Sequence, residues 1–509
     1  MSAADERLLD EWRRPDRDVR IGVEWMTPLR DVSEQYVSPE RSLRKLWTYF
    51  RRFGAWDMLR KVRSRLSESA RNRKVAGFGF GRVIEAPAAG PNPGTPVCFF
   101  APSAAADAAR IVVDIAFVRP AKQGARPSGG PQELPEPLEP YLAWSSFSGV
   151  PLDAGAIAAG LDVLIADAAT GSAPSPEAAV QTSVADARAL PRRTPDKPAV
   201  AVFGLGNYAK QLIIPNIPPE MELVRVHEID PRQLAGWGRS DVSLDTCPWP
   251  RDDERYDLWF VAGYHSTHAP IALTALKRGG AVAVEKPLAT TRADLEALRD
   301  RLAAMPEARL FTCFQRRYAD YNRWIREDLA AAPGSPIDYN CIVYEIPLSP
   351  LHWYGWPGSG GRIVSNGCHW IDHFMYLNDY AEVASATAMP GAHNGSTVLI
   401  TLANGAEFMM RLTEIGSPRI GVRDHIEVSQ GSRTATIRNA EHYAAEDASR
   451  TIRRRRVKVM TAYRQMYREI CRRVLTGGPG DSLASLGSSF ATVDLDAQLG
   501  AGPAAPRSA

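Results

Sequence analysis

A run of alternating strand and helix patterns between residues 199 and 291 constrains the fold more than any other feature. Four apolar segments predict strands: "AVAVFGLG", "MELVRVHEID", "YDLWFVAGYHS" and "GAVAVEKPL". Helical patterns such as "HAPIALTALKRG" lie between them. Strands that alternate with helices form a parallel sheet covered on both faces. This region therefore predicts a doubly wound α/β domain.

The first of these strands runs into a glycine-rich turn with the pattern Gly204-x-Gly206-x-x-Ala209. A turn of this kind between a strand and a helix is typical of dinucleotide-binding domains. Gly204 permits the tight turn, Gly206 lets the backbone approach a pyrophosphate, and Ala209 keeps the helix close to the sheet. The helix N-terminus then supplies amide donors for the phosphates.

An acidic residue ends the second predicted strand and indicates which dinucleotide binds. Glu228 stands 24 positions beyond Gly204, where a carboxylate can bind both ribose hydroxyls of the adenosine half and repels a 2′-phosphate. NAD is therefore favoured as the cofactor. NADP stays possible because Arg225 and Arg232 are close in sequence.

After about residue 337 the pattern changes to extended runs punctuated by turns. These runs are "IDYNCIVYEI", "EVASATAMPG", "STVLITLANGAEFMMRLTEIG", "DHIEVSQGSRTATIRN" and "RRRRVKVM". They predict an α/β domain with an open, mostly antiparallel sheet. We expect the late helical pattern "AYRQMYREICRRVLTG" to close this domain.

The N-terminal third predicts a smaller β-rich unit. The strand patterns are "VAGFGFGRVIEAP", "PVCFF" and "RIVVDIAFV", and a proline-rich stretch ending near Pro198 marks a domain boundary. Gly77, Gly79 and Gly81 imitate a nucleotide loop, but a Pro/Gly turn follows them instead of a helix. Residues 35–70 carry an apolar helical pattern with basic residues between, read as an amphipathic helix pair or as a basic face for an anionic partner.

Size and composition fit a soluble protein of several domains. The chain has 509 residues, is 45% hydrophobic and carries a net charge of +3, so no general attraction to nucleic acid is expected. No apolar run is long enough to span a membrane, and the N-terminus lacks a signal-peptide pattern. The six cysteines are scattered without a CxxC pair, which suits reduced thiols and a cytoplasmic location.

Four motifs together resemble one family. "AVFGLGNYA", "FVAGYHSTHAPIALTALKRGGAVAVEKPLA", "TCFQRRY" and "GGRIVSNGCHWIDHFMYL" occur in the order and spacing of the glucose–fructose oxidoreductase / inositol dehydrogenase (Gfo/Idh/MocA) family. The resemblance covers about residues 198–480. It implies a Rossmann domain and an α/β domain whose open sheet often mediates oligomerisation. It also implies NAD(P)-linked hydride transfer on a sugar, cyclitol or related small molecule.

The resemblance also assigns roles to individual residues. Lys286, in Glu285-Lys286-Pro287, matches the lysine that contacts the reacting hydroxyl, and His369 matches the histidine that commonly acts as general base. Coenzyme contacts are expected from the turn, from the loop after the third strand and from the lysine motif, at Asn207, Tyr208, His265, His268, Glu285 and Lys286. Substrate contacts are expected from Asn366, Trp353 and Arg316.

One position departs from the family pattern. Many members carry an aspartate four positions before the histidine, and this chain has Ser365 there. A serine cannot supply the negative charge that stabilises an imidazolium or raises lysine basicity. Two readings follow: Ser365 and Asn366 position the substrate through hydrogen bonds, or the protein is a catalytically impaired nucleotide- or sugar-binding subunit with a regulatory or assembly role.

A metal centre is a third interpretation of the same stretch. His369 and His373 are four residues apart, with Asp372 and Cys368 close by. No glutamate lies between the histidines as in the metalloprotease pattern, and no distant ligand is evident, so we predict no metal. Asp372 is then expected to cap or orient backbone and His373 to be exposed. Arg453–Arg456 is expected to lie on a solvated sheet edge.

The N-terminal third has a second, weaker likeness. "SLRKLWTYFRRFGAWDMLRKVRSRL", "GFGFGRVIEAP" and "PVCFF" resemble the start of two-domain oxidoreductases in which an alcohol-dehydrogenase-like segment precedes a Gfo/Idh/MocA module. The predicted division is a degenerate GroES-like accessory domain at 1–195, a Rossmann domain at 196–320 and a substrate and oligomerisation domain at 321–509.

Overall fold

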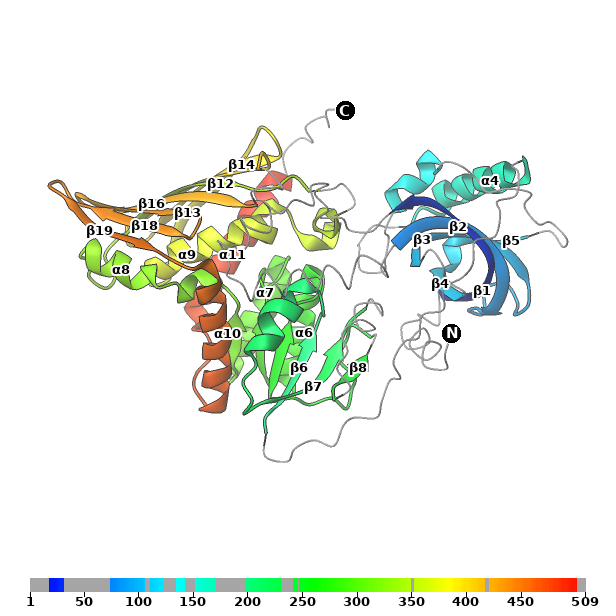
Figure 1. Ribbon diagram of the computed structural model, residues 1–509, viewed down its shortest axis with the longest axis horizontal. Helices are drawn as coiled ribbons and strands as arrows, with labels where there is room; N and C mark the ends of the chain where they lie inside the picture. The colour runs from blue at the N-terminus through cyan, green and yellow to red at the C-terminus, as the bar shows by residue number, and fades with distance from the viewer. Residues whose placement is uncertain are drawn as a thin grey trace.

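Three β-sheets organise the chain in the computed structural model (Figure 1). The structure describes residues 18–31, 74–105, 110–121, 134–141, 152–170, 197–229, 241–245, 247–348, 352–416 and 421–500. The helical pattern predicted over residues 35–70 and most of the proline-rich boundary before Pro198 lie outside the described residues. The predicted fold class, a parallel Rossmann sheet followed by a mostly antiparallel sheet and preceded by a β-rich unit, is confirmed.

The N-terminal sheet has five strands in the order β4-β1-β2-β3-β5, and all of its pairings are antiparallel. The strands are β1 (Asp18–Asp31), β2 (Lys74–Glu85), β3 (Pro96–Ala105), β4 (Arg110–Asp114) and β5 (Val118–Pro120). Helix α4 (Ala154–Thr170) packs its buried leucines against phenylalanines of this sheet. Gly77, Gly79 and Gly81 lie within β2 and pair with β1 and β3, so they form strand and not a nucleotide loop, as predicted.

The second sheet is entirely parallel, with strand order β11-β10-β9-β6-β7-β8. The sequence predicted four of its strands: β6 (Ala199–Phe203), β7 (Glu222–His227), β9 (Leu258–Val261) and β10 (Ala281–Val284). It missed the short edge strands β8 (Ser243–Asp245) and β11 (Leu310–Thr312), which have only three residues each. Buried side chains form one core on each face of the sheet. Helices α6 (His268–Lys277) and α7 (Arg292–Ala304) contribute to the first of these cores.

The crossover after β6 is shorter and less regular than the predicted helix. A π-helical turn, Ala209–Ile213, is followed at once by a 3-10 turn, Ile214–Asn216. Pro215 stands in that second turn, where its ring and missing N–H disfavour a longer α-helix. The crossover is therefore too short to carry a long helix dipole.

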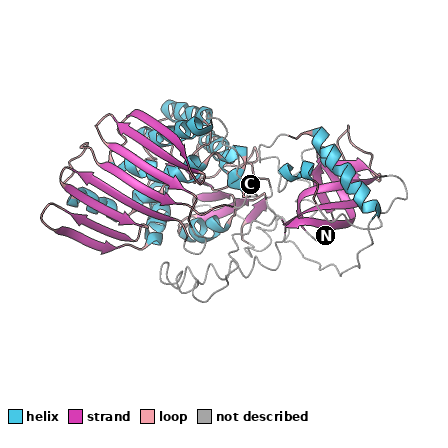
Figure 2. Ribbon diagram, turned by 90° about the horizontal axis from the view of Figure 1, so that it is seen from above, coloured by secondary structure: helices cyan, strands magenta, loops and turns pink. Residues whose placement is uncertain are grey.

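The third sheet has eight strands in the order β13-β14-β15-β12-β16-β17-β18-β19 (Figure 2). Only the β12–β15 pair is parallel. The strands are β12 (Asp338–Tyr344), β13 (Val383–Gly391), β14 (Gly395–Leu402), β15 (Glu407–Thr413), β16 (Arg423–Gln430), β17 (Arg433–Arg438), β18 (His442–Glu446) and β19 (Thr451–Arg456). Strand β18 was not predicted from the sequence.

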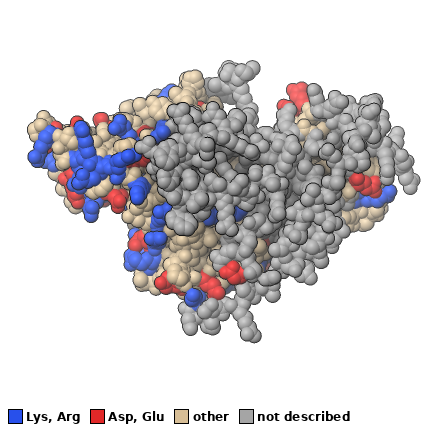
Figure 3. Space-filling model, in the orientation of Figure 1, with Lys and Arg blue, Asp and Glu red and all other residues tan. Residues whose placement is uncertain are grey.

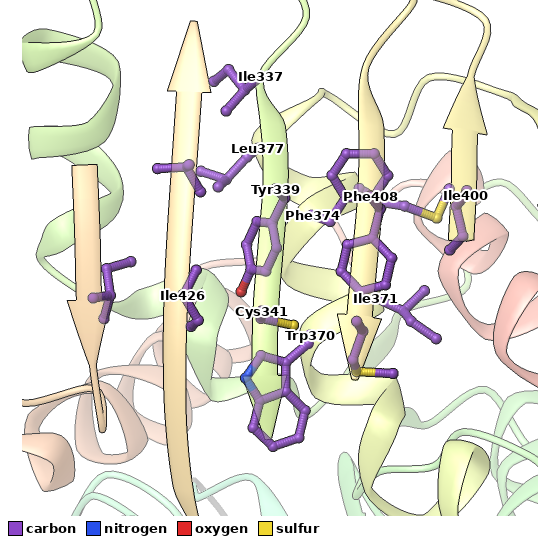
Figure 4. Close-up of a cluster of buried hydrophobic side chains, with 14 of the residues drawn as sticks. Ile337, Tyr339, Cys341, Trp370, Ile371, Phe374, Leu377, Ile400, Phe408 and Ile426 are labelled. Carbon is purple, nitrogen blue, oxygen red and sulfur yellow. The ribbon is translucent and has the colours of Figure 1, made fainter. Parts of the chain in front are cut away.

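One face of this sheet is covered by helices, and the other is open. Side chains along β12 alternate strictly, with Tyr339, Cys341 and Val343 buried between more exposed neighbours. Helix α9 (Cys368–Leu377) packs Trp370 and Phe374 against the buried side of the sheet (Figure 4). A period of two along the strand therefore places the core on one face only.

The last helices return to other parts of the fold. Helix α10 (Val459–Leu475) was predicted to close the second domain, and this expectation is wrong. Its apolar face, with Met466, Tyr467 and Ile470, is buried in a core of the parallel sheet. Helix α11 (Leu486–Gly500) packs against both α9 and α7. Helix α8 (Tyr321–Asp328) lies under β17 and β18.

The arginine run lies on β19, which is an edge strand as predicted. Arg453 pairs with Glu327 and Asp328, while Arg455 and Arg456 are exposed. Figure 3 shows lysine and arginine side chains gathered at this end of the molecule. Charged side chains on an edge strand discourage pairing with other strands. Among the described helices, none has the length and apolar character needed to cross a membrane.

Candidate active site

The glycine-rich loop after β6 has the geometry of a dinucleotide turn. Gly204 has φ +98°, and a Cβ there would lie 2.5 Å from the carbonyl oxygen of Ala262. Only glycine tolerates both constraints. A Cβ on Gly206 would meet no atom within 4 Å, so open space lies beside that backbone. Ala209 is buried where the crossover meets the sheet core.

Glu228 lies directly beneath this loop. Its carboxylate accepts a hydrogen bond from the Leu205 N–H at 2.6 Å, and the side chain is buried at the carboxyl end of β7. The sequence-predicted acid and the predicted phosphate loop therefore meet, as a dinucleotide requires. Together with the space beside Gly206, these residues fit an NAD-type group.

Tyr208 of the same loop joins a buried polar network. The hydroxyl of Tyr467 in α10 lies 3.0 Å from the Tyr208 hydroxyl and also hydrogen-bonds the Glu285 carboxylate. Burial raises the pKa of Glu285 to about 7, although the hydrogen bond from Tyr467 and the charge of Lys286 oppose the shift. The phosphate loop, the lysine motif and α10 are thus linked. Asn207 is exposed beside them.

Lys286 follows β10 and points to the segment that precedes α9. Its ammonium donates to the Ser365 carbonyl at 2.8 Å, to Asn366 Oδ1 at 3.1 Å and to the Tyr354 hydroxyl at 3.4 Å. Burial disfavours the ammonium, but the acidic groups around it outweigh this effect and raise the pKa of Lys286 above its usual value. These contacts bring Lys286 to the backbone of Ser365 and to the side chain of Asn366.

His369 and Ser365 both carry buried polar atoms without a described partner. Within the described residues, neither His369 Nδ1 nor Ser365 Oγ has a hydrogen-bond partner. Burial lowers the pKa of His369 well below its usual value, and the charges of Lys286 and Arg316 lower it further. His369 is therefore neutral near pH 7, the form that can accept a proton.

The two histidines after β9 hold the backbone of the site. His268 Nδ1 lies 2.7 Å from the Pro287 carbonyl and its Nε2 lies 3.2 Å from the Gly263 carbonyl. His265 Nδ1 lies 2.8 Å from the Ser359 carbonyl. Burial lowers the pKa of both histidines. The described contacts of His265 and His268 hold the loops beside Lys286. Contact between these histidines and the coenzyme stays a prediction.

An aromatic segment, residues 352–356, covers the loop after β9. Trp353, in the short helix Trp353–Gly355, packs edge-on against His265 with ring centres 4.6 Å apart and against Tyr264 at 5.3 Å. The Tyr354 ring lies 5.7 Å from the Lys286 ammonium. Trp353 is only partly buried.

Arg316 is less accessible than a substrate-binding arginine would be. It is buried, forms an ion pair with Asp424 and lies 4.7 Å from the Trp370 ring centre. Its Nε and Nη1 have no hydrogen-bond partner in the described part of the chain. Contact between Arg316 and a substrate stays a prediction that depends on these two atoms.

The polar side chains that follow His369 serve the packing of α9. Asp372 binds Arg317 at 2.6 Å and accepts from the Ser488 hydroxyl at 2.8 Å. His373 was expected to be exposed, and this is wrong: it is fully buried between the Tyr339 hydroxyl and the Asn322 amide. Asp372 and His373 thus each bind other side chains of the protein.

A second polar cluster, not predicted from the sequence, lies at the edge of the parallel sheet. His227, Asp245 and Glu254 each offer a ligand atom within 4.8 Å of the others, an arrangement that can hold a metal ion. Arg225 pairs with both carboxylates and Arg251 with Asp245. Two guanidinium groups therefore balance the charge of the two carboxylates.

Glu345, which follows β12 directly, was not predicted as a site residue. It is buried, forms an ion pair with Arg362 at 3.2 Å and hydrogen-bonds the Asn366 side chain. Asn366 is the residue that Lys286 contacts. The only signal was the placement of an acid directly after a strand, which is too common to identify a site.

The fold and site define a dinucleotide-type Rossmann domain joined to an α/β domain with an open sheet. Residues 199–310 match the profile of the Gfo/Idh/MocA oxidoreductase family, described as its NAD-binding Rossmann fold. The chain therefore carries the NAD-binding domain of that family. For residues 199–310 this match confirms the predicted family and the predicted class of coenzyme, an NAD-type dinucleotide.

Individual relatives are distant. Inositol 2-dehydrogenase 3 of Saccharopolyspora erythraea is 27% identical over 197 residues, which are 38% of this chain and 56% of that protein. A solved Thermotoga maritima structure described as an oxidoreductase has a TM-score of 0.50 and 17% identity, covering 60% of this chain and 98% of that one. A 3-ketoreductase from Actinomadura kijaniata, solved with NADP and TDP-benzene, has a TM-score of 0.48 and 18% identity, covering 58% of this chain and 96% of that one. The Thermotoga likeness shows the shared fold.

Proposed function

We propose that this protein is an NAD(P)-dependent oxidoreductase that acts at a carbinol or carbonyl carbon of a sugar, cyclitol or sugar nucleotide. The observation that carries the proposal is the position of Lys286. Its ammonium lies at the carboxyl end of the parallel sheet and contacts the segment that leads to His369. In open α/β sheets this edge is where ligands bind.

Each residue has a defined part in this proposal. A bound nicotinamide coenzyme would accept or supply the hydride. Lys286 would donate a hydrogen bond to the reacting oxygen and stabilise negative charge there. His369, neutral near pH 7, would take the hydroxyl proton in the oxidation direction. Because Tyr354 is the most distant acceptor of Lys286, at 3.4 Å, a substrate oxygen would replace it first.

The substrate class rests on the relative that acts on inositol and on the aromatic segment. Inositol is a cyclitol, and the Saccharopolyspora erythraea relative is named for its dehydrogenation. An aromatic face such as that of Trp353 can pack on the apolar face of a sugar or cyclitol ring. Asn366 and Ser365 would supply hydrogen bonds to ring hydroxyls.

For the coenzyme we propose NAD in preference to NADP. The buried Glu228 carboxylate beneath the phosphate loop would accept hydrogen bonds from the ribose hydroxyls and repel a 2′-phosphate. Titrating the protein with NADH and NADPH by nicotinamide fluorescence tests this. Tighter binding of NADPH would contradict it.

The test of activity is a turnover screen. The full chain, mixed with NAD or NADH, is assayed against cyclitols, sugars, sugar nucleotides and their keto forms by the near-ultraviolet absorbance of NADH. Turnover of one class supports the proposal. Coenzyme binding without turnover on any member of the panel counts against it.

The second candidate function is a binding subunit without catalysis. The described acceptors already satisfy Lys286, and Ser365 offers no carboxylate to His369. A protein of this kind would bind NADH and a sugar ligand with no hydride transfer. Protection of the protein against heat by a sugar nucleotide, in the absence of turnover, would favour it.

We further propose that the open face of the eight-stranded sheet mediates homo-oligomerisation. Ile342, Leu399 and Met409 are exposed on it, at 42%, 40% and 48%, and Leu399 and Met409 are cross-strand partners. Exposed apolar patches of this kind usually mark interfaces. Met409→Lys is expected to lower the oligomeric state measured by light scattering, whereas Val163→Lys on α4 would not.

The domain roles complete the proposal. Residues 1–195 would be an accessory unit without its own coenzyme. Residues 196–320 together with helix α10 would be the coenzyme domain, and the rest of residues 321–509 the substrate domain. Cys98, Cys313, Cys341, Cys368 and Cys471 are free and buried, as suits a reducing cytoplasm. Removing residues 1–195 is expected to leave NADH binding intact.

A further inference from the structure

Helix α10 brings one buried tyrosine to the coenzyme end of the parallel sheet. The helix lies beside that sheet (Figure 1), and Tyr467 belongs to the sheet core. The Tyr467 ring packs edge-on against Phe260 of β9, with ring centres 6.0 Å apart. Its hydroxyl reaches Glu285, the residue that follows β10 directly. A residue from near the end of the chain thus lies beneath the site.

The Tyr467 hydroxyl joins two elements at once. It hydrogen-bonds the Glu285 carboxylate and lies 3.0 Å from the Tyr208 hydroxyl of the phosphate loop. Burial raises the pKa of both phenols well above its usual value, so each keeps its hydrogen near pH 7. A phenol donates one hydrogen bond and accepts others through its lone pairs. Tyr467 can therefore donate to Glu285 while it accepts from Tyr208.

Tyr208 stands where the glycine-rich turn becomes the crossover. It directly precedes the π-helical turn Ala209–Ile213, and its side chain makes no capping hydrogen bond to that turn. The Tyr208 ring packs edge-on against Tyr463 of α10, with ring centres 6.1 Å apart. Two residues of α10 therefore contact this side of the turn, one through its ring and one through its hydroxyl.

Helix α10 is attached to the sheet by contacts outside the phosphate loop. The Arg309 guanidinium donates to the Val474 carbonyl at 3.3 Å. Beyond the helix, the Asp481 N–H donates to the Leu310 carbonyl at 2.7 Å, and the Asp481 carboxylate accepts from the Thr312 N–H at 2.9 Å. These bonds hold the helix and the segment after it against edge strand β11. The helix therefore has an anchor that does not involve the turn.

We propose that Tyr467 is a positioning residue for the coenzyme: its hydroxyl connects Tyr208 to Glu285 and so holds the glycine-rich turn in the form that receives the pyrophosphate. The inference rests on the proposed coenzyme binding and is independent of turnover. Tyr467 has no exposed surface, so it acts through Tyr208 and not by touching a ligand.

The binding test compares two tyrosines one helical turn apart on α10. Tyr467→Phe keeps the ring and removes the hydroxyl. We expect it to bind NADH about five- to tenfold more weakly by fluorescence titration, because a buried hydrogen-bonded link is lost. Tyr463→Phe removes a hydroxyl from the ring beside Tyr208 and is expected to bind NADH within about twofold of wild type. An equal loss of binding in both variants would contradict the inference.

A kinetic split and a double-mutant cycle test the same link. At saturating coenzyme, kcat of Tyr467→Phe is expected to stay within about twofold of wild type, because only coenzyme binding is affected. Tyr208→Phe removes the other hydroxyl of the link and carries the binding test if Tyr467→Phe folds poorly. The variant Tyr208→Phe/Tyr467→Phe should bind NADH within about twofold of either single variant. Losses that multiply would overturn the inference.

A further readout needs neither ligand nor activity. Amide hydrogen exchange is measured on coenzyme-free protein, for peptides that cover residues 204–210. In Tyr467→Phe these amides are expected to exchange at least about threefold faster than in wild type, and in Tyr463→Phe at the wild-type rate. Peptides from α6 are the internal control and should exchange at the wild-type rate in both variants.

The outcomes separate this inference from the proposed function. If wild type binds NADH without turnover and Tyr467→Phe binds it more weakly, the oxidoreductase proposal fails and the positioning role stands. If Tyr467→Phe matches wild type in NADH affinity and in exchange over residues 204–210, the inference is wrong whether or not the protein turns over. Faster exchange in α6 as well would show that Tyr467 only stabilises the domain, and would also overturn the inference.

Discussion

The coenzyme half of the candidate site is assembled from residues close in sequence, whereas the substrate half joins segments far apart. Glu228 reaches the phosphate loop across 23 positions, while Lys286 reaches Asn366 across 80. The first half depends on a strand, a turn and one acid. The second depends on how two sheets are placed against each other.

The largest expected effect is on kcat when Lys286 is replaced, because this residue belongs to the substrate half and not to the coenzyme half. Lys286→Met keeps the length of the side chain but removes its charge and donors. We expect kcat to fall by about 10³-fold, because the oxyanion loses its donor, with NADH affinity changed less than about threefold. Lys277→Met, at an exposed position of α6, is the matched control. An equal loss of NADH binding in Lys286→Met would contradict the division into halves.

The next largest effect is on NADH binding when the glycine turn of the coenzyme half is changed. Gly204→Ala introduces a Cβ at φ +98° that would lie 2.5 Å from the Ala262 carbonyl oxygen. We expect about 100-fold weaker NADH binding by fluorescence titration, because the turn must move. Gly279→Ala also has a positive φ, +78°, but meets no atom within 4 Å. It should bind NADH like wild type; if both variants lose binding equally, backbone strain alone is responsible.

A pH-dependent effect tests the network that joins the halves. The pKa of Glu285 is raised to about 7 in the folded protein, above its unfolded value. Its contribution to stability is therefore fully present below the unfolded pKa and is lost as the pH rises through 7. Glu285→Gln should gain about 2 kcal/mol of unfolding free energy relative to wild type between pH 5 and pH 8.

Denaturant unfolding at both pH values measures this gain. Glu307→Gln, an exposed glutamate, serves as the control and should show no such pH dependence. A Glu285→Gln variant whose relative stability is the same at pH 5 and pH 8 would show that the carboxyl is ionised throughout.

The smallest effect concerns ligand packing in the substrate half. Trp353→Ala removes a ring that packs on His265 and Tyr264. We expect the KM of a cyclic substrate to rise about tenfold, with kcat nearly unchanged, as stacking contributes on the order of 1 kcal/mol. Initial-rate kinetics at saturating coenzyme measure it. A fall in kcat with no change in KM would assign Trp353 to the chemistry instead.

The difference between contacts within one sequence region and contacts between distant segments also explains what the sequence could predict. The glycine turn, Glu228 and the lysine motif follow from local strand and helix patterns, and the structure places them together. Helix α10 was assigned to the wrong core because an amphipathic pattern shows which side chains are buried but not which sheet covers them. His373 was misjudged for the same reason, since its partners Tyr339 and Asn322 come from other elements.

Glu345 shows the limit most clearly. It contacts Arg362, which lies on a segment that reaches Glu345 only in the folded chain. Position 365 drew attention because the family pattern predicts an acid there.

The most direct test of the account is the turnover of wild-type protein with NAD and a cyclitol or sugar deuterated at its carbinol carbon. Hydride transfer from the carbinol carbon predicts that deuterium appears on the nicotinamide ring of the reduced coenzyme. It also predicts that the deuterated substrate reacts more slowly than the undeuterated one. Coenzyme that binds but stays free of deuterium across the whole panel would contradict hydride transfer and leave a binding subunit in its place.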